Sequence, residues 1–98
     1  MREPTGICQL CGRHVPESLM GEHHLLPRSH GGSAEHEVKL CSMCHSFLHA
    51  TFTNRTLAES FNTLKALRQD SEVRSFVSWV RTQKPHSYSE VHTREEKR

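Results

Sequence analysis

Histidine and cysteine are concentrated in the middle of this 98-residue chain, between residues 22 and 49. The metal-ligating side chains of this stretch are His23, His24, His30, His36, Cys41, Cys44, His45 and His49. Imidazole and thiolate groups are the ligands that zinc and related transition metals prefer in proteins. The density of both side-chain types therefore predicts metal binding.

The spacing of these residues predicts two separate metal sites. His45 and His49 are four residues apart, so a helix would project them from one face, where two imidazoles can bind one cation. On the same helix Cys44 would lie about 100° round from His45, so that it serves a different ion together with Cys41. We therefore expect a thiolate site and a histidine site that share the start of one helix, the histidine site being completed from the His23-His24 doublet.

A second cysteine pair, Cys8-x-x-Cys11, is typical of a zinc knuckle, in which a tight turn places two thiolates on one ion. We expect Cys8, Cys11, Cys41 and Cys44 to hold a structural Zn²⁺ together. The pairs are separated by residues 12–40, a longer gap than the about 15–20 residues of common paired knuckles, so another unit is inserted between them. A disulfide framework is the less favoured alternative, because we expect a reducing compartment.

Composition limits the remaining possibilities. A chain of 98 residues that is 34% hydrophobic forms one small domain, whose core needs help from a metal or disulfides. The net charge of +2 is too small to argue for nucleic acid by itself. No apolar run approaches a membrane span, and the first residues lack the apolar core of a signal peptide, so we expect a cytoplasmic protein without membrane association. The oligomeric state stays open.

The elements that must position the ligands are a pair of strands and a helix. Alternating apolar residues predict strands over residues 21–26 and 36–40, joined by a loop that Pro27 and Gly31-Gly32 keep from being helical. A helix is predicted from residue 42, and residues 13–19 are expected to form a loop. The result is a β-loop-β-α unit with ligands on its first strand and its helix.

Two further helices are predicted after this unit. One covers residues 53–68 and starts with a capping box from Thr56 to Glu59, and the other begins at an Asp70 cap and ends near residue 84. Their apolar stripes should cover the small sheet; they consist of Leu57, Phe61, Leu64, Leu67, Val73, Phe76, Val77 and Val80. Residues 86–98 are charged and without periodicity, so we expect one domain over residues 1–85 and a disordered tail.

Taken together, these motifs resemble the HNH nuclease family, whose shared unit is the ββα-metal fold. The matching residues are Cys8-x-x-Cys11, His23-His24-x-x-Pro27, Gly31-Gly32, His36, Cys41-x-x-Cys44-His45 and His49. The resemblance covers about residues 8–50, and it is specific because the separate elements occur in the right order and spacing. It implies an α+β fold: a small ββα-metal unit with a four-cysteine zinc site and two C-terminal helices.

The resemblance also implies roles for individual residues. His23 matches the metal-binding position of the doublet and His24 the general base, while His45 and His49 match the final metal-binding histidines. His36 falls where the family usually has Asn, a residue that orients the loop of the base or binds metal. We count His36 with His24 as a catalytic candidate and leave its role open between these two.

The implied activity is metal-dependent hydrolysis of DNA phosphodiester bonds by a one-metal mechanism with a histidine base. Three imidazoles suit Zn²⁺, Ni²⁺, Co²⁺ or Mn²⁺ better than Mg²⁺, although the resemblance also allows Mg²⁺. Arg28, next to the doublet, is the first candidate for a phosphate contact, and Arg13, Lys39 and Arg55 are weaker ones.

Two other function classes remain open. His24 or His36 could close the histidine site as a fourth ligand, since closed four-ligand sites are structural. The chain would then be a non-catalytic zinc-binding module for nucleic acid with a second structural metal. The third class is a zinc-dependent scaffold for protein interaction.

Overall fold

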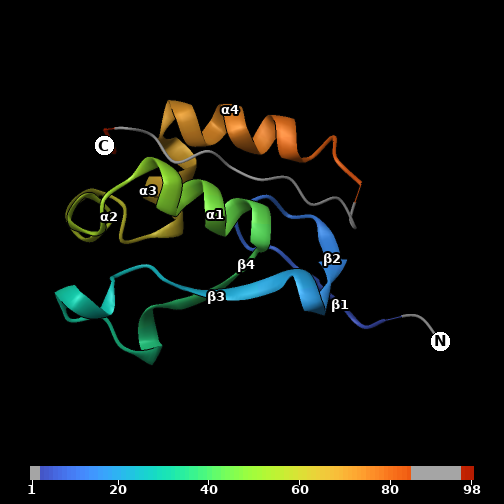
Figure 1. The fold of residues 1–98 in the computed structure, drawn as a ribbon, viewed down its shortest axis with the longest axis horizontal. Helices are drawn as coiled ribbons and strands as arrows, with labels where there is room; N and C mark the ends of the chain where they lie inside the picture. Colours follow the sequence, from blue (N-terminus) through green and yellow to red (C-terminus); the bar gives the residue numbers. More distant parts are fainter. Residues whose placement is uncertain (1–2, 85–95) are drawn as a thin grey trace.

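The computed structural model describes residues 3–84 and 96–98, which form two small antiparallel sheets and a set of short helices (Figure 1). The strands are β1 (Thr5–Ile7), β2 (His14–Pro16), β3 (Met20–His24) and β4 (Glu37–Cys41). The helices are α1 (Ser42–Thr51), α2 (Asn54–Ser60), α3 (Leu64–Gln69) and α4 (Ser71–Val80), and the single 3-10 turns are η1 (Glu17–Leu19), η2 (Arg28–His30) and η3 (Ala34–His36). The predicted α+β class is confirmed.

The hairpin of β3 and β4, followed directly by α1, is the predicted β-loop-β-α unit. The strands pair antiparallel with Met20 opposite Cys41, His23 opposite Val38 and His24 opposite Glu37. Residues directly opposite each other on paired strands point to the same face of the sheet, so His23 and Val38 share one face. Both side chains are buried. That face is covered by α1, since the His23 ring contacts the rings of His45 and His49.

The sheet of β1 and β2 was not predicted, because residues 13–19 were expected to form a loop. The knuckle between these strands reverses the chain, with Gly12 at φ 81° and the N–H of Cys8 donating to the carbonyl of Arg13 over 3.0 Å. This reversal brings Gly6 opposite Val15. Pro16 ends β2 at an edge, where its missing N–H costs no ladder bond.

The helix predicted over residues 53–68 is divided into α2 and α3 at residues 61–63. Thr63 caps α3 by accepting from the N–H of Ala66, and Phe61 leaves helical geometry with its ring against Phe52 at 4.7 Å between centroids. Local capping bonds of this kind compete with a continuous helix. The predicted capping box is also wrong, because Thr53 rather than Thr56 caps α2. The Asp70 cap of α4 is confirmed.

The helices were expected to pack directly on the small sheet, but α1 lies between the β3–β4 hairpin and α4 (Figure 1). Helix α4 therefore packs on α1 rather than on the sheet. Phe47 of α1 stacks on Phe76 of α4 with ring centroids 4.1 Å apart. Among residues 3–84 and 96–98, no helix has the length and apolar character that a membrane crossing requires.

Most of the predicted tail, residues 86–95, lies outside the described residues. The last three residues are described, and Arg98 contacts the domain. Its guanidinium lies 2.8 Å from Oδ1 of Asp70 and 3.3 Å from Oε1 of Glu72, and its backbone N–H donates to the carbonyl of Thr51.

Candidate active site

Four cysteine side chains converge beside the start of α1. Cys8 and Cys11 come from the knuckle, Cys41 ends β4 and Cys44 lies in the first turn of α1; all four are buried free thiols whose sulfurs lie within 4.8 Å of one another. The sulfurs of Cys11 and Cys41 are 3.9 Å apart. Four thiolates about 2.3 Å from a tetrahedral zinc ion would be separated by about 3.8 Å. The cluster therefore fits a zinc ion as the sequence predicted.

Arg13 lies against this thiolate cluster and not on an open surface. Its Nη2 donates to the sulfur of Cys41 over 3.3 Å, and its Nη1 donates to the carbonyl of Lys84 over 3.1 Å. Its Nε is buried and has no partner among the described residues. The sequence suggested Arg13 as a phosphate contact, but the structure directs its positive charge to sulfur, because four thiolates concentrate negative charge there.

A second cluster is formed by three imidazoles, those of His23 on β3 and of His45 and His49 on α1. One ring nitrogen of each lies within 4.8 Å of the others. His23 is only 1% exposed, and neither of its ring nitrogens has a hydrogen-bond partner in the described part of the chain. Two such unsatisfied buried groups are costly unless a ligand completes them. The arrangement thus fits a metal ion shared by the three rings.

Electrostatic effects favour the uncharged form of the three imidazole rings, which is the form that binds a cation. Burial, and then the neighbouring rings of His49 and His45, lower the pKa of His23 to about 4. Burial likewise lowers the pKa of His45 and of His49. Near neutral pH all three rings are therefore uncharged, and a neutral imidazole has the lone pair that binds a metal.

The two clusters are separate, as the helical spacing predicted. Cys44 faces the thiolates, and the next residue, His45, faces His23 and His49. Neither His24 nor His36 belongs to the three-imidazole cluster within residues 3–84 and 96–98.

His24 lies at the end of β3 and lines an open groove of about 400 Å³ together with His45 and His49. The other residues of the groove are Glu22, Pro27, Arg28, Ser29 and Asn54. Arg28 Nε donates to His24 Nε2 over 3.3 Å, and Glu37 Oε1 lies 3.2 Å from the same nitrogen. These contacts belong to different proton positions, since Nε2 accepts from Arg28 when it carries a lone pair and donates to Glu37 when it carries a proton.

The loop after His24 is held in place by His36 and by two glycines. The N–H of Ser33 donates to Nδ1 of His36 over 3.2 Å, and the N–H of Leu25 donates to the carbonyl of His36 over 2.8 Å. Gly31 has φ 92°, and a Cβ on Gly32 would collide with the carbonyl oxygen of Leu26. The described contacts of the His36 ring are thus to the loop and not to the imidazole cluster.

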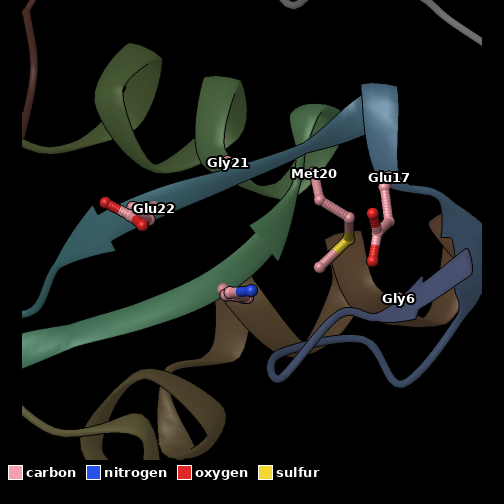
Figure 2. Close-up of a pocket in the computed structure, with 6 residues that line it drawn as sticks. Gly6, Glu17, Met20, Gly21 and Glu22 are labelled. Carbon is pink, nitrogen blue, oxygen red and sulfur yellow. The ribbon is translucent and has the colours of Figure 1, made fainter.

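Two other cations suggested as phosphate contacts lie outside the groove. Lys39 lines a separate hollow whose walls include Glu17 and Glu22, and Figure 2 shows Glu17 beside Met20 there, with Glu22 farther along β3. Arg55 is exposed on α2 and pairs with Glu59 over 3.2 Å. Arg55 is thus paired with a carboxylate and Lys39 lines another hollow, which leaves Arg28 as the suggested cation that lines the groove.

Sequence reasoning missed two residues at this site. Glu37 reaches His24 only because of the register of the hairpin, which no local pattern specified. Asn54 lines the groove because α2 begins directly after α1. A strand register assigned by pairing His23 with Val38, both on an apolar face, would have revealed Glu37 opposite His24.

Comparison with known proteins identifies a family and two relatives that this chain resembles. A family model described as HNH endonuclease matches residues 8–61, more than half of the chain. The "Uncharacterized protein YisB" of Bacillus subtilis (strain 168) is 42% identical over 84 residues, which are 86% of this chain and 82% of that protein. The "Type IV methyl-directed restriction enzyme EcoKMcrA" of Escherichia coli (strain K12) is 33% identical over 67 residues, 60% of this chain.

The chain spans only about a quarter of the length of the restriction enzyme, since the match covers 24% of it. No solved structure matches the chain significantly. The matched region of the family model contains both metal-ligating clusters, the groove and α2. By its sequence motifs and the extent of this match, the chain belongs to the HNH endonuclease family.

Proposed function

We propose that this protein is a metal-dependent endonuclease that hydrolyses phosphodiester bonds in DNA, with His24 as general base. The observation that carries the proposal is the groove in which His24 and Arg28 lie beside His45 and His49 of the imidazole cluster. A base, a cation-binding cluster and a phosphate-binding cation in one open groove are the groups that this hydrolysis needs. DNA as substrate is supported by the family and by the name of the Escherichia coli relative, a restriction enzyme.

His23, His45 and His49 would hold the catalytic ion, for which Zn²⁺, Ni²⁺, Co²⁺, Mn²⁺ and Mg²⁺ are the candidates. A divalent cation bound there supplies stabilisation of the negative charge that develops on the phosphoryl oxygens. Three protein ligands leave coordination positions open, whereas structural sites are closed by four. The separation of His24 and His36 from the cluster therefore favours a catalytic site over a second structural metal.

The remaining side chains of the groove would bind the phosphate and move the proton. Arg28, which is exposed, offers a planar guanidinium that matches phosphate oxygens. His24, with Nε2 or Nδ1 unprotonated, takes a proton from the attacking water. Glu37 and Arg28 both contact Nε2, so they orient the ring. His36 acts as a positioning residue, because its contacts are to the loop.

The thiolate cluster would hold a structural zinc ion. It ties the knuckle, β4 and α1 together, and α1 carries two of the three imidazoles. In a chain this small, such an ion contributes much of the folding free energy. Its role is to fix the positions of His45 and His49, not to contact the substrate.

A plasmid-cleavage assay with a panel of divalent ions tests the proposal. Supercoiled DNA should be nicked or linearised with at least one of Mg²⁺, Mn²⁺, Ni²⁺, Co²⁺ and Zn²⁺, and a chelator should stop the reaction. His24→Ala should lose turnover by about 10²- to 10⁴-fold with an unchanged melting temperature. His30→Ala, which alters an exposed histidine outside the cluster, is the matched control. Absence of cleavage by folded protein with every ion would refute the proposal.

A further inference from the structure

Three arginines gather in a hollow on the side of α4, far along the chain from the motifs of the nuclease groove. Arg68, at the end of α3, and Arg74 and Arg81, on α4 and just after it, line a hollow of about 290 Å³ with Ser78 and apolar side chains at its base. A second hollow of about 330 Å³ adjoins it, since Arg74 and Ser78 line both, and Ser71 and Ser75 complete its wall.

Two of these arginines are held in place by the zinc knuckle. Arg81 Nε donates to the carbonyl of Cys11 over 2.9 Å, and Arg68 Nη2 donates to the carbonyl of Gln9. Each guanidinium carries five N–H donors, so most of them remain for a ligand. A cation fixed in this way loses little side-chain entropy when it binds an anion.

Arg74 completes the set and is exposed, with no side-chain hydrogen bond to any residue that the structure describes. No acidic side chain lines either hollow within residues 3–84 and 96–98. The hollow that Lys39 lines differs in this respect, because Glu17 and Glu22 line it as well. The described residues that line these two hollows therefore include three arginines and no carboxylate.

We propose that this surface, defined by Arg68, Arg74, Arg81 and the hydroxyls of Ser71, Ser75 and Ser78, binds the phosphate backbone of DNA. Arginine and serine side chains are typical phosphate contacts. Residues 71–81 extend over about 15 Å of helix, which corresponds to several phosphates at about 3.4 Å of rise per nucleotide. The inference rests on the proposed DNA substrate and adds a contact that lies outside the cleavage groove and carries no base specificity.

The zinc knuckle would then also position two arginines of the α4 surface, in addition to its role in folding. Because the carbonyls of Cys11 and Gln9 hold Arg81 and Arg68, the thiolate cluster that orders the knuckle also orders this surface. The structural ion thereby links folding of the knuckle to DNA affinity, independently of the ion in the groove.

The test measures binding of a fluorescein-labelled DNA duplex by anisotropy over a range of salt concentrations. Full-length zinc-loaded protein carrying His24→Ala is used as the parent, so that the duplex is not cut. Arg74→Ala should weaken binding about three- to tenfold at low salt and lower the slope of log Kd against log salt by about 1, and Arg74→Glu should weaken it further. Lys39→Ala removes the same charge in a different hollow, which Glu17 and Glu22 also line, and it should leave both values near those of the parent.

Equal affinity and slope for Arg74→Ala and the parent would overturn the inference, as would an equal loss in Lys39→Ala or a parent with no measurable DNA affinity. Cleavage by the protein with His24 intact separates the two proposals. If the protein cleaves DNA but Arg74→Ala leaves its DNA affinity unchanged, only the proposed role of the α4 surface is refuted. Protein that binds through Arg74 and cuts nothing would refute only the nuclease activity.

Discussion

Nε2 of His24 lies 3.2 Å from Oε1 of Glu37, its direct neighbour across the β3–β4 hairpin. Nε of Arg28 lies 3.3 Å from the same nitrogen, which accepts from Arg28 when it is unprotonated and donates to Glu37 when it is protonated. The proposed base is therefore held between a carboxylate from β4 and a guanidinium from the loop that follows β3. Its orientation depends on the register of the hairpin.

Substitution of Glu37 should affect turnover more than DNA binding. We expect Glu37→Ala to lower kcat about 10- to 100-fold, because the ring of His24 loses the partner that orients it. Glu37→Gln should recover part of this loss, since an amide oxygen can accept the same hydrogen bond. Single-turnover cleavage kinetics give the measurement, and equal rates for Glu37→Ala and wild type would show that Glu37 plays no part.

The two possible roles of His36 make different predictions for ion binding. Because its ring bonds to Ser33 and lies outside the imidazole cluster, His36→Ala should slow cleavage while the number of bound ions stays the same. His36→Asn supplies another acceptor at the same turn and should retain more activity than His36→Ala. Loss of one bound ion from His36→Ala, measured by isothermal titration, would instead identify His36 as a ligand.

Removal of one thiolate should destabilise the whole domain. We expect Cys41→Ser to lose the structural zinc and to lower the free energy of unfolding by several kcal/mol, on the order of a structural zinc contribution. Zinc content by mass spectrometry and the melting temperature provide the measurement. Ser46→Ala, an exposed change on the same helix, should alter neither quantity. An unchanged melting temperature for Cys41→Ser would contradict a structural role.

Arg13 should strengthen the thiolate site. Its guanidinium donates to the sulfur of Cys41 and joins it to the carbonyl of Lys84, so Arg13→Ala should lower the free energy of unfolding by about 1–3 kcal/mol and speed zinc loss to a chelator. Arg13→Lys keeps the charge but lacks the planar fork that spans both partners, and it should be intermediate. If zinc loss is equally fast in all three proteins, the contact is not stabilising.

The buried imidazole of His23 predicts a pH dependence of stability. Its pKa is about 4 in the folded protein, against an ordinary value near 6.5, so between these values the unfolded chain binds a proton that the folded protein does not. The free energy of unfolding should therefore fall as pH decreases from about 6.5, by about 3 kcal/mol once pH is below 4.

Urea denaturation at several pH values measures this effect. His23→Leu removes the titrating group, so its stability should depend less on pH across the same range. Identical pH profiles for wild type and His23→Leu would mean that the ring is not held neutral by the fold.

Much of the candidate site was predictable from the sequence, because its ligands are specified by local spacing. On any helix, residues four positions apart share a face, so His45 and His49 point the same way. Cys44, which precedes His45, must then point in another direction. The helical division at residues 61–63 was less predictable. It depends on competition between a Thr63 cap, the packing of Phe61 on Phe52 and a continuous apolar stripe.

By itself, the amino-acid sequence determined the ligand types, their grouping into two sites and the α+β class, since these follow from side-chain chemistry and from spacing within single elements. Only the tertiary structure decided that Glu37 contacts His24, that Arg13 donates a hydrogen bond to the sulfur of Cys41 and that the arginines of α3 and α4 line one hollow. The first two of these contacts join residues that are 13 and 28 positions apart in the sequence. Their formation depends on strand register and helix packing, which depend on the free energy of the whole chain and not on any local pattern.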